Sequence, residues 1–336
     1  MTVALLLACS HQVPPAASGA PDEAHELVAS TQAVVDANFN VQRGHAAAER
    51  ARELGLEDIE REWIDWFSVQ KNVVIELPGG DDVVYLVAHY DKVDLNLLTV
   101  VSTMLNGALH PLVSWSFLSD GAVDNATGVA VVLQLAADLN ELPERRYTYR
   151  ILLAGSEESG LRGTRAHLAR LSAEDKDRIA LAVNIDTTGL RTTGNCVMAD
   201  VSNAEMTRAS LQAARELGVP LEEGTIPPGA SSDHAPFARN GPGLDIGRSA
   251  MFNMPGALLP QRSYFTSRSS TEVLFMSSCE LIDLWDYVGG CFCIPTGNLH
   301  GPRDSADKVD PTRLWQSYAV LHEVLMDGER EGLPLP

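Results

Sequence analysis

After an N-terminal helical region, the chain alternates between short apolar segments and longer amphipathic ones. Apolar runs of strand length occupy residues 82–88, 147–154 and 179–185, and helical spacing of apolar residues occupies 128–142 and 204–217. Strands that alternate with helices of this length are typical of α/β proteins. We therefore predict a three-layer sandwich, in which helices flank a mixed, largely parallel central sheet.

Further segments extend this pattern. We expect helices at residues 21–35, 45–66, 163–171 and 311–326, and a strand at 72–77 that pairs with the one at 82–88 across a Pro-Gly-Gly-Asp turn. No internal repeat and no linker interrupts the chain after residue 25. The sequence therefore predicts a single catalytic domain over residues 26–336.

The first 25 residues differ in character. Residues 3–8 are apolar and lead into Leu-Leu-Ala-Cys9, which resembles the bacterial lipobox, and a Ser-, Pro- and Ala-rich stretch follows. In a lipobox the new N-terminal cysteine carries lipid, so we expect residues 1–25 to form a leader and a flexible tether. This predicts an extracytoplasmic protein of the bacterial cell envelope, lipid-anchored at Cys9, periplasmic or secreted. The alternative is that residues 3–8 are apolar by chance and are not an export signal. Such a signal normally begins with basic residues, and here no Lys or Arg precedes Arg43.

The charge balance narrows the range of partners. The chain carries 25 Lys and Arg against 45 Asp and Glu, a formal net charge of -20. Such a field repels phosphate backbones and anionic lipid surfaces, so we expect neither nucleic-acid binding nor electrostatic membrane docking, whereas metal cations are attracted. No segment offers about 18 consecutive apolar residues, and we therefore expect no transmembrane helix.

The cysteines are less informative. Cys279, Cys291 and Cys293 lie close enough in sequence for one disulfide in an oxidising compartment, and the pairing among them stays open. Their Cys-x-Cys spacing lacks the second pair of a structural zinc site, which argues against metal binding there.

Side chains suited to metal binding or acid–base chemistry follow three of the expected strands. They are His89, Asp91, Glu157, Glu158 and Asp186. Neighbouring loops add Asp124, just before a helix, and His300, before the last helix. Taken singly, each has a structural explanation, such as a helix cap for Asp124. Because ligands gather beyond the carboxyl ends of the strands in α/β folds, we expect these residues to share one site.

The donor types indicate the metal. Imidazole and carboxylate ligands without cysteine suit zinc, or a similar divalent cation, in a site that keeps an open position for water. The adjacent carboxylates of Glu157 and Glu158 repel each other unless a cation or a shared proton compensates. The sequence therefore predicts a zinc site that can activate water.

These motifs, in this order, resemble the co-catalytic di-zinc exopeptidases typified by bacterial leucyl aminopeptidase and aminopeptidase Y. The motifs are His89-x-Asp91, Asp124-Asn125-x-x-Gly128, Glu157-Glu158, Asn184-x-Asp186 and His300. The resemblance spans about residues 70 to 325 of the chain. It implies the zinc-exopeptidase, or phosphorylase/hydrolase-like, fold and a zinc-dependent exopeptidase, in the first place an aminopeptidase.

The resemblance also implies two co-catalytic zinc ions and their ligands. Asp124 would bridge the two ions. His89 and Asp186 would complete one zinc site, and Glu158 and His300 the other.

Two further residues would take part in catalysis by the same resemblance. Glu157 would be the general base that takes a proton from the attacking water, and Asp91 would hold His89. The implied substrate is a peptide with a free N-terminal amine.

Other functions stay open. A carboxypeptidase or dipeptidase of the same family would share the metal ligands, with a basic residue such as Arg162, Arg262 or Arg268 for a substrate carboxylate. A glutaminyl-cyclase-like acyltransferase would use a related fold with a single zinc, and the complete two-metal set argues against it. A non-catalytic binding module is disfavoured because no ligand and no base is missing.

Three segments lie outside these assignments. Ser232-Asp233-His234 resembles a segment near the active site in this family, but His234 stays outside the predicted ligand set because substrate contact and a structural role are equally open. The stretch between Lys92 and Asp120 contains enough apolar material for an extra helical flap. Residues 256–298 have no counterpart that we can align.

Overall fold

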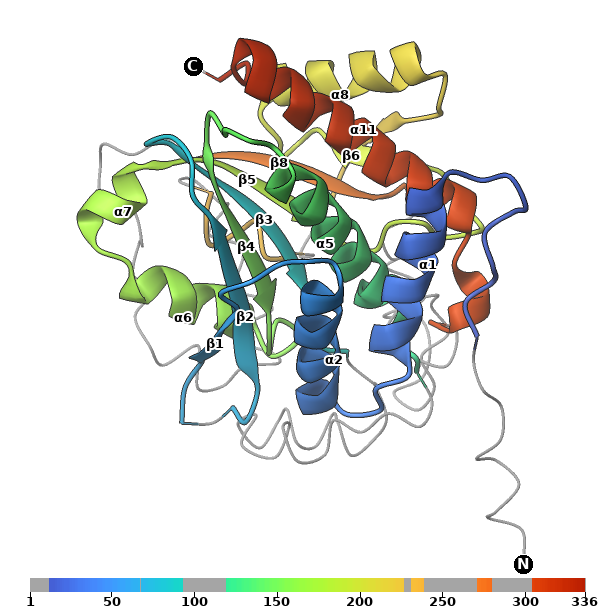
Figure 1. Ribbon diagram of the computed structural model, residues 1–336, viewed down its shortest axis with the longest axis horizontal. Coiled ribbons are helices and arrows are strands. Elements are labelled where there is room, and N and C mark those ends of the chain that lie inside the picture. Colours follow the sequence, from blue (N-terminus) through green and yellow to red (C-terminus); the bar gives the residue numbers. More distant parts are fainter. Residues whose placement is uncertain are drawn as a thin grey trace, which may run out of the picture.

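The computed structural model describes residues 12–66, 68–92, 119–226, 231–238, 271–279 and 304–335. Within these residues the chain forms an eight-stranded sheet with the order β1-β2-β4-β3-β5-β8-β6-β7 (Figure 1). The strands are β1 (Glu60–Trp63), β2 (Lys71–Leu77), β3 (Val83–His89), β4 (Thr148–Ala154), β5 (Ile179–Ile185), β6 (Asn195–Met198), β7 (Glu222–Gly224) and β8 (Glu272–Ser278).

The middle of this sheet is parallel. β3 pairs in parallel with β4 and with β5, and β5 pairs in parallel with β8. Antiparallel pairs lie outside this group, between β1 and β2, β2 and β4, and β6 and β8. Every residue of β3 is buried, as expected for a central strand that is covered on both faces. The predicted mixed, largely parallel sheet is confirmed.

The predicted pairing of β2 with β3 is wrong. A tight turn joins these strands, but β4 lies between them and pairs with both. The turn passes so close to the start of β4 that a Cβ at Gly79 would lie 2.1 Å from the carbonyl oxygen of Tyr147, and one at Gly80 would lie 2.0 Å from that of Arg146. Glycine at both positions therefore lets the turn pass over the start of β4. The apolar pattern alone does not distinguish this arrangement from a hairpin of β2 and β3.

The helix predicted over residues 45–66 is wrong in its second half. α2 (Asn40–Glu53) ends just before Gly55, which has a φ of +80°. This left-handed conformation favours glycine and does not continue an α-helix. Residues 60–63 instead form the strand β1, which pairs antiparallel with the start of β2.

Each face of the sheet has its own helices. Val84, Leu86 and Ala88 of β3 join the larger apolar cluster, whereas Tyr85 and Val87 join the smaller one, as the alternation of a strand requires. The larger cluster includes residues from α1 (Asp22–Val35), α2, α5 (Thr127–Asn140), α8 (Ala204–Leu217) and α11 (Pro311–Glu331). The smaller cluster includes residues from α6 (Arg162–Arg170), which is followed by the short helix α7 (Ala173–Asp177).

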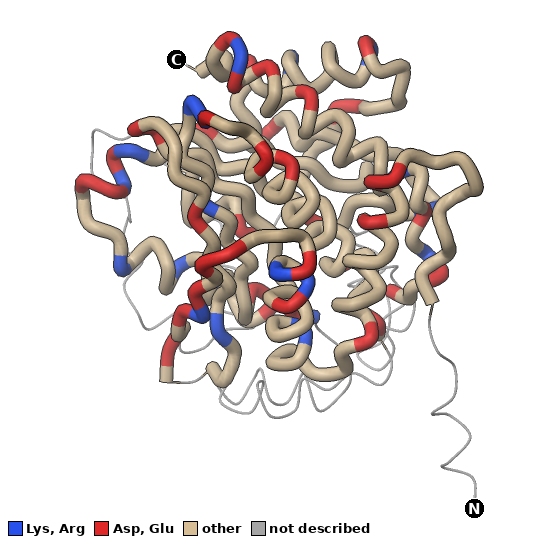
Figure 2. Tube along the Cα trace, in the orientation of Figure 1, with Lys and Arg blue, Asp and Glu red and all other residues tan. Residues whose placement is uncertain are grey.

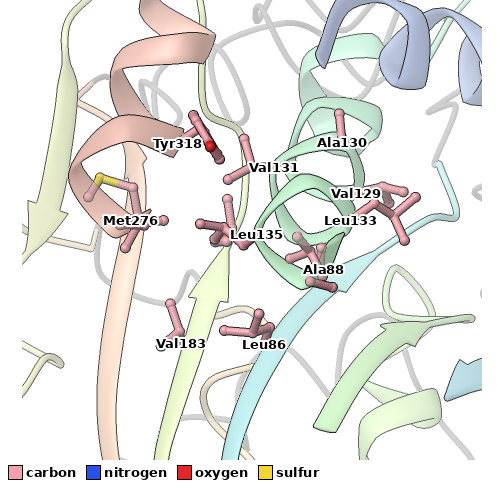
Figure 3. Close-up of a cluster of buried hydrophobic side chains, with 14 of the residues drawn as sticks. Leu86, Ala88, Val129, Ala130, Val131, Leu133, Leu135, Val183, Met276 and Tyr318 are labelled. Atoms are coloured by element: carbon pink, nitrogen blue, oxygen red, sulfur yellow. The ribbon is translucent and has the colours of Figure 1, made fainter. Parts of the chain in front are cut away.

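α5 is the central helix of the larger cluster. Its Val131 and Leu135 lie over Leu86 of β3 and Val183 of β5 (Figure 3). The segment Ala122–Asn140, which consists of α5 and the turn before it, is the one helical segment among the described residues that is long and apolar enough to cross a membrane, and 89% of its most apolar 18 residues are buried inside the protein. The protein core therefore accounts for the apolar character of this helix.

The N-terminal packing begins earlier than expected. Val13 is buried, and its backbone amide donates a 2.7 Å hydrogen bond to the side chain of Gln32 in α1. Val13 and the first residues of α1, which begins at Asp22, therefore belong to the folded part, although they lie within the stretch expected to form a leader and a tether. The predicted lipidation site, Cys9, lies outside the described residues.

A disulfide joins Cys196 of β6 to Cys279, the residue that follows β8. The sequence left the pairing among Cys279, Cys291 and Cys293 open, and Cys279 pairs outside that group, with Cys196. The two half-cystines are 83 residues apart in sequence but lie on neighbouring strands, so the partner depends on the sheet order. Cys291 and Cys293 lie outside the described residues.

Candidate metal centre

The predicted site residues come from neighbouring parallel strands. His89 is the last residue of β3 and lies beside Ala154, the last residue of β4. Glu157 and Glu158 follow β4 closely, and Asp186 follows β5 directly. The carboxyl ends of these strands share one edge of the sheet, and the structure brings the side chains together there.

Three of these side chains converge on one point. The Nε2 atom of His89 lies 3.1 Å from Oδ1 of Asp124 and 3.4 Å from Oδ1 of Asp186, and all three residues are buried. His89 also forms a second group with Glu157 and Glu158. Within each group, the possible ligand atoms all lie within 4.8 Å of one another. His89 therefore lies where two groups of possible metal ligands meet.

The charges in this site are unbalanced. Burial raises the pKa of Glu157 well above its usual value; the positive charge of a protonated His89 opposes the shift, and repulsion from Glu158 adds to it. Burial and repulsion from Asp124 do the same to the pKa of Glu158. Burial works to lower the pKa of His89, but the carboxylates around it, Glu157 first, raise it well above its usual value. A single imidazole is thus the group that offsets the negative charge of several carboxylates.

This donor set fits zinc. Imidazole nitrogen and carboxylate oxygen are ligands that zinc binds readily, and a divalent cation would offset the repulsion among the acids. Among the described residues, the buried Oδ1 atom of Asp186 accepts no hydrogen bond and has Nε2 of His89 beside it, at 3.4 Å, so it is available to a cation. Acidic positions also outnumber basic ones over the molecule as a whole (Figure 2).

Asp91 connects His89 to the glutamate pair. Its carboxylate accepts hydrogen bonds from the backbone amides of Glu157, at 3.0 Å, and Glu158, at 3.3 Å. The same carboxylate lies 3.7 Å from Nδ1 of His89, and the Asp91 carbonyl oxygen lies 3.1 Å from that nitrogen. Asp91 is therefore in position to orient His89, and it also fixes the loop that carries both glutamates, which the sequence did not indicate.

Asn125 fixes the loop that carries Asp124. Its side-chain nitrogen donates to the carbonyl of Ile185, the residue before Asp186, and its side-chain oxygen accepts from the amides of Gly128 and Thr187. A Cβ at Gly128 would lie 2.2 Å from that oxygen, so glycine is needed for this contact. Asn125 thereby ties Asp124 and Asp186 together.

Ser232 supports Asp186 from the other side. Its hydroxyl donates a 2.6 Å hydrogen bond to Oδ2 of Asp186 and accepts one of 2.9 Å from the side chain of Asn184. The Ser-Asp-His motif placed this segment near the site in the sequence, but the bond from Ser232 was not anticipated. Such bonds hold a metal ligand in a fixed orientation.

The next two residues of this segment are buried as well. Asp233 accepts a 2.5 Å hydrogen bond from the hydroxyl of Thr164, and burial raises its pKa to about 7. The ring of His234 stacks on Phe275 with 4.8 Å between ring centroids, and burial lowers its pKa to about 4. His234 belongs to neither group of possible metal ligands among the described residues, and its stacking favours a structural role.

The last predicted ligand, His300, lies outside the described residues. The segment that follows it is anchored beside Asp124, because Oδ1 of Asp304 accepts a 2.8 Å hydrogen bond from the amide of Val123. The amide of Ala306 donates in turn to the side chain of Asp120. The chain thus returns to the loop that carries Asp124 just after His300.

The arginines considered for a substrate carboxylate are only partly described. Arg162 forms an ion pair with Asp65, and its Nε donates to that carboxylate at 2.9 Å. Arg262 and Arg268 lie outside the described residues. Arg162 is therefore already engaged by a carboxylate of the protein itself.

Comparison with known sequences gives a consistent assignment. The profile of peptidase family M28 matches residues 72–325. Aminopeptidase YwaD of Bacillus subtilis (strain 168) is 27% identical over 164 residues, which cover 48% of this chain and 30% of that protein. The match thus spans less than a third of the length of this relative.

Comparison with solved structures concerns the fold. The LapA aminopeptidase of Legionella pneumophila matches with a TM-score of 0.60 at 13% identity, over 90% of this chain and 71% of that one. A glutaminyl cyclase from an Acidobacteriales bacterium matches with a TM-score of 0.62 at 17% identity, over 96% and 99% of the two chains. The same fold therefore occurs in proteins of both names.

Proposed function

This chain belongs to peptidase family M28, and on that premise we propose that it is a zinc-dependent aminopeptidase that hydrolyses N-terminal residues from peptides. The observation that carries the proposal is the convergence of His89, Asp124 and Asp186 beside the paired glutamates. A buried site with this excess of carboxylates is suited to metal-assisted hydrolysis.

In this proposal the protein binds two zinc ions. Asp124 would be shared by both ions, His89 and Asp186 would hold one of them, and Glu158 and His300 would hold the other. The group of His89, Asp124 and Asp186 supports the first position, and Glu158 lies close enough to His89 to support a second position beside it. When bound, two zinc ions polarise the scissile carbonyl and lower the pKa of the attacking water.

Glu157 is the general base. Burial raises the pKa of Glu157 well above its usual value, against the charge of His89, and a raised pKa suits a carboxylate that accepts and returns a proton. Glu157 accepts the proton from the attacking water and delivers it to the nitrogen of the leaving amine. Asp91 keeps this loop in place through the amides of Glu157 and Glu158.

The acidic surroundings favour a substrate with a free amine. A protonated N-terminus is attracted to the excess of carboxylates, and a substrate carboxylate is repelled by it. The engagement of Arg162 by Asp65 removes one candidate for binding a substrate carboxylate. This supports aminopeptidase over carboxypeptidase activity.

Glutaminyl-cyclase-like acyl transfer is the second candidate. The nearly complete mutual coverage with a glutaminyl cyclase favours it at the level of the fold. A single-zinc cyclase does not need the full ligand set, whereas here His89 lies within 3.4 Å of Asp186 as well as close to Asp124. The site therefore favours hydrolysis.

We also propose an extracytoplasmic location, with a lipid anchor at Cys9. The disulfide between Cys196 and Cys279 supports the extracytoplasmic location, because such bonds form and persist mainly in oxidising compartments.

Three substrate sets separate the candidates. The purified protein is incubated with aminoacyl anilides, with peptides that are blocked at the amine and have a free carboxyl end, and with peptides that begin with glutamine. The proposal predicts hydrolysis of the free-amine compounds only. Cleavage of blocked peptides from their carboxyl end would indicate a carboxypeptidase, and release of ammonia with formation of a pyroglutamyl peptide would indicate a cyclase.

A further inference from the structure

Arg43 lies entirely inside the protein, behind the metal centre. It belongs to α2, and its side chain is fully buried. Burial lowers the pKa of Arg43 to about 10, against the attraction of four nearby acids, so the side chain stays positively charged at neutral pH. The acids are Asp304, Asp91, Asp124 and Asp120.

The guanidinium binds backbone carbonyl groups from three parts of the chain. Its Nε donates to the carbonyl of Tyr90 at 2.5 Å, and its terminal nitrogens donate to those of Asp120, at 2.8 Å, and Gly121, at 2.7 Å. A longer bond of 3.3 Å reaches Val34 at the end of α1. One side chain thereby crosslinks segments that are 47 and 78 residues away in sequence.

Two of these segments carry predicted metal ligands. Tyr90 lies between His89 and Asp91, and Gly121 lies three residues before Asp124. Gly121 has a φ of +59°, and a Cβ there would lie 3.0 Å from a terminal nitrogen of Arg43. The guanidinium therefore packs directly against the turn that leads to Asp124.

The rest of the first half of α2 strengthens the same contact. Asn40 exchanges two hydrogen bonds with the backbone of Lys92, at 3.2 and 3.1 Å. The Lys92 ammonium donates to the carbonyl of Ser119 at 2.6 Å. A Cβ at Gly44 would lie 2.7 Å from the ring of Tyr90, so glycine lets α2 lie against that ring. Residues 90–92 and 119–121 are thus held together by one turn of helix.

We propose that Arg43 is a positioning residue for the metal centre, which sets the separation between the segment that carries His89 and Asp91 and the loop that carries Asp124. The inference rests on the proposed zinc site. An arginine suits this role because its planar fork offers five donors in fixed directions, whereas a lysine offers three from a single point. Its charge also opposes the repulsion among the acids on the ligand side.

Arg43 lies before the part of the chain that matches the family profile. The family profile begins at residue 72, so α2 lies outside the matched region. The metal centre of this chain therefore depends on a helix that precedes the family region.

The test compares Arg43→Lys with Ala51→Gly. Ala51 is a buried residue of the same helix, and its replacement weakens α2 without touching any of the four carbonyl groups. For each protein, zinc affinity is measured by competition with a chelator, kcat and KM are measured on an aminoacyl anilide, and Tm is measured without metal. Asn40→Ala is a second, smaller change in the same contact.

We expect Arg43→Lys to lower zinc affinity and kcat by about 10-fold to 100-fold, as changes in residues that support metal ligands do, with little change in KM. Asn40→Ala lowers zinc affinity less, and Ala51→Gly keeps it near the wild-type value despite a loss in Tm. If zinc affinity follows Tm alone across these proteins, or if the folded Arg43 and Asn40 variants bind zinc as the wild type does, Arg43 is merely structural and the inference is wrong. A wild type that binds no zinc contradicts the proposed function itself.

Discussion

Two clusters of buried and half-buried ionisable side chains in this protein differ in how their charges are matched. Beneath α6, His167 contacts Glu62 at 2.9 Å and the hydroxyl of Tyr85 at 3.0 Å, and that hydroxyl also accepts a hydrogen bond from Arg150. Glu62 is bound further by Arg170. At the carboxyl edge of the sheet, by contrast, one histidine faces several acids.

The same residue type shifts in opposite directions in the two clusters. Burial works to raise the pKa of Glu62, but bonds from His167 and Asn72 lower it below its usual value. The pKa of Glu157 is raised well above its usual value by burial and by neighbouring carboxylates. The charges of the first cluster are matched within the protein, whereas the second has an excess of carboxylates that a cation would offset. This contrast separates a structural network from a site that binds a ligand.

The largest expected effect comes from Glu157→Gln. This change removes the proton acceptor and should lower kcat by about 100-fold to 10,000-fold while bound zinc is retained. The matched control is Glu62→Gln, the same substitution in the cluster of Glu62, His167 and Arg170. This control should leave kcat near the wild-type value. Equal loss of kcat in both variants, measured on one anilide substrate, would remove the functional distinction between the clusters.

Zinc should also stabilise the fold. At a free zinc concentration 100 times Kd, a single site adds about 2.7 kcal/mol to the free energy of unfolding. Chelation should therefore lower Tm and abolish activity, and Glu62→Gln should show the same zinc-dependent increment from a lower starting Tm. A Tm that does not respond to zinc would show that the acidic cluster needs no cation.

Glu62→Gln tests the cluster of Glu62, His167 and Arg170. The loss of the charged partner of His167 and Arg170 should cost about 1 to 3 kcal/mol of unfolding free energy at pH 7. Because the folded-state pKa of Glu62 is lowered, its contribution is present above the unfolded pKa and is lost as the pH falls through the folded value. Denaturant unfolding of both proteins from pH 7 to pH 3 should show the difference shrinking, and a constant difference would contradict the account.

A smaller effect should follow from Ser232→Ala. The variant loses the hydrogen bond to Asp186, and we expect about 10-fold weaker zinc binding, at the low end for residues that support metal ligands. Ser210→Ala is the control, because Ser210 is also buried and its hydroxyl donates to the carbonyl of Met206 within α8. Zinc affinity that falls equally in both variants would assign the effect to stability rather than to Asp186.

Parts of the fold were predictable because their signals are local. β5 occupies residues 179–185 and α8 occupies residues 204–217, with the predicted bounds. Asn203 caps α8 by accepting from the amides of Glu205 and Met206, and Gly218 ends the helix in a left-handed conformation. Cap residues and a buried apolar run define such elements without knowledge of their neighbours.

Other parts depend on contacts distant in sequence. β6 and β7 have four and three residues, too few for a periodic pattern, and they form only by pairing with strands distant in sequence. The position of β4 between β2 and β3 is likewise a property of the sheet. The same limit applies to Cys196, whose partner lies on a neighbouring strand.

The candidate site divides in the same way. His89, Asp91, Glu157, Glu158 and Asp186 were identified because each lies at or just after the end of a strand, and parallel strands bring their ends to one edge. Asp124 precedes a helix, and it was assigned as a ligand through the family resemblance. Ser232 and Arg43 were not identified. The sequence around a loop serine, or around an arginine within a helix, does not indicate which distant residue its side chain binds. Their roles depend on hydrogen bonds that span 46 and 78 residues.

We propose that the acidic cluster around His89, with Asp124, Asp186, Glu157 and Glu158, binds two zinc ions. Elemental analysis of the purified wild type, after dialysis against metal-free buffer, measures this directly, with Asp124→Asn as the comparison. The account predicts two zinc ions per chain in the wild type and a clear loss in the variant, because Asp124 would serve both ions. One zinc or none in the wild type, or equal zinc in both proteins, would contradict it.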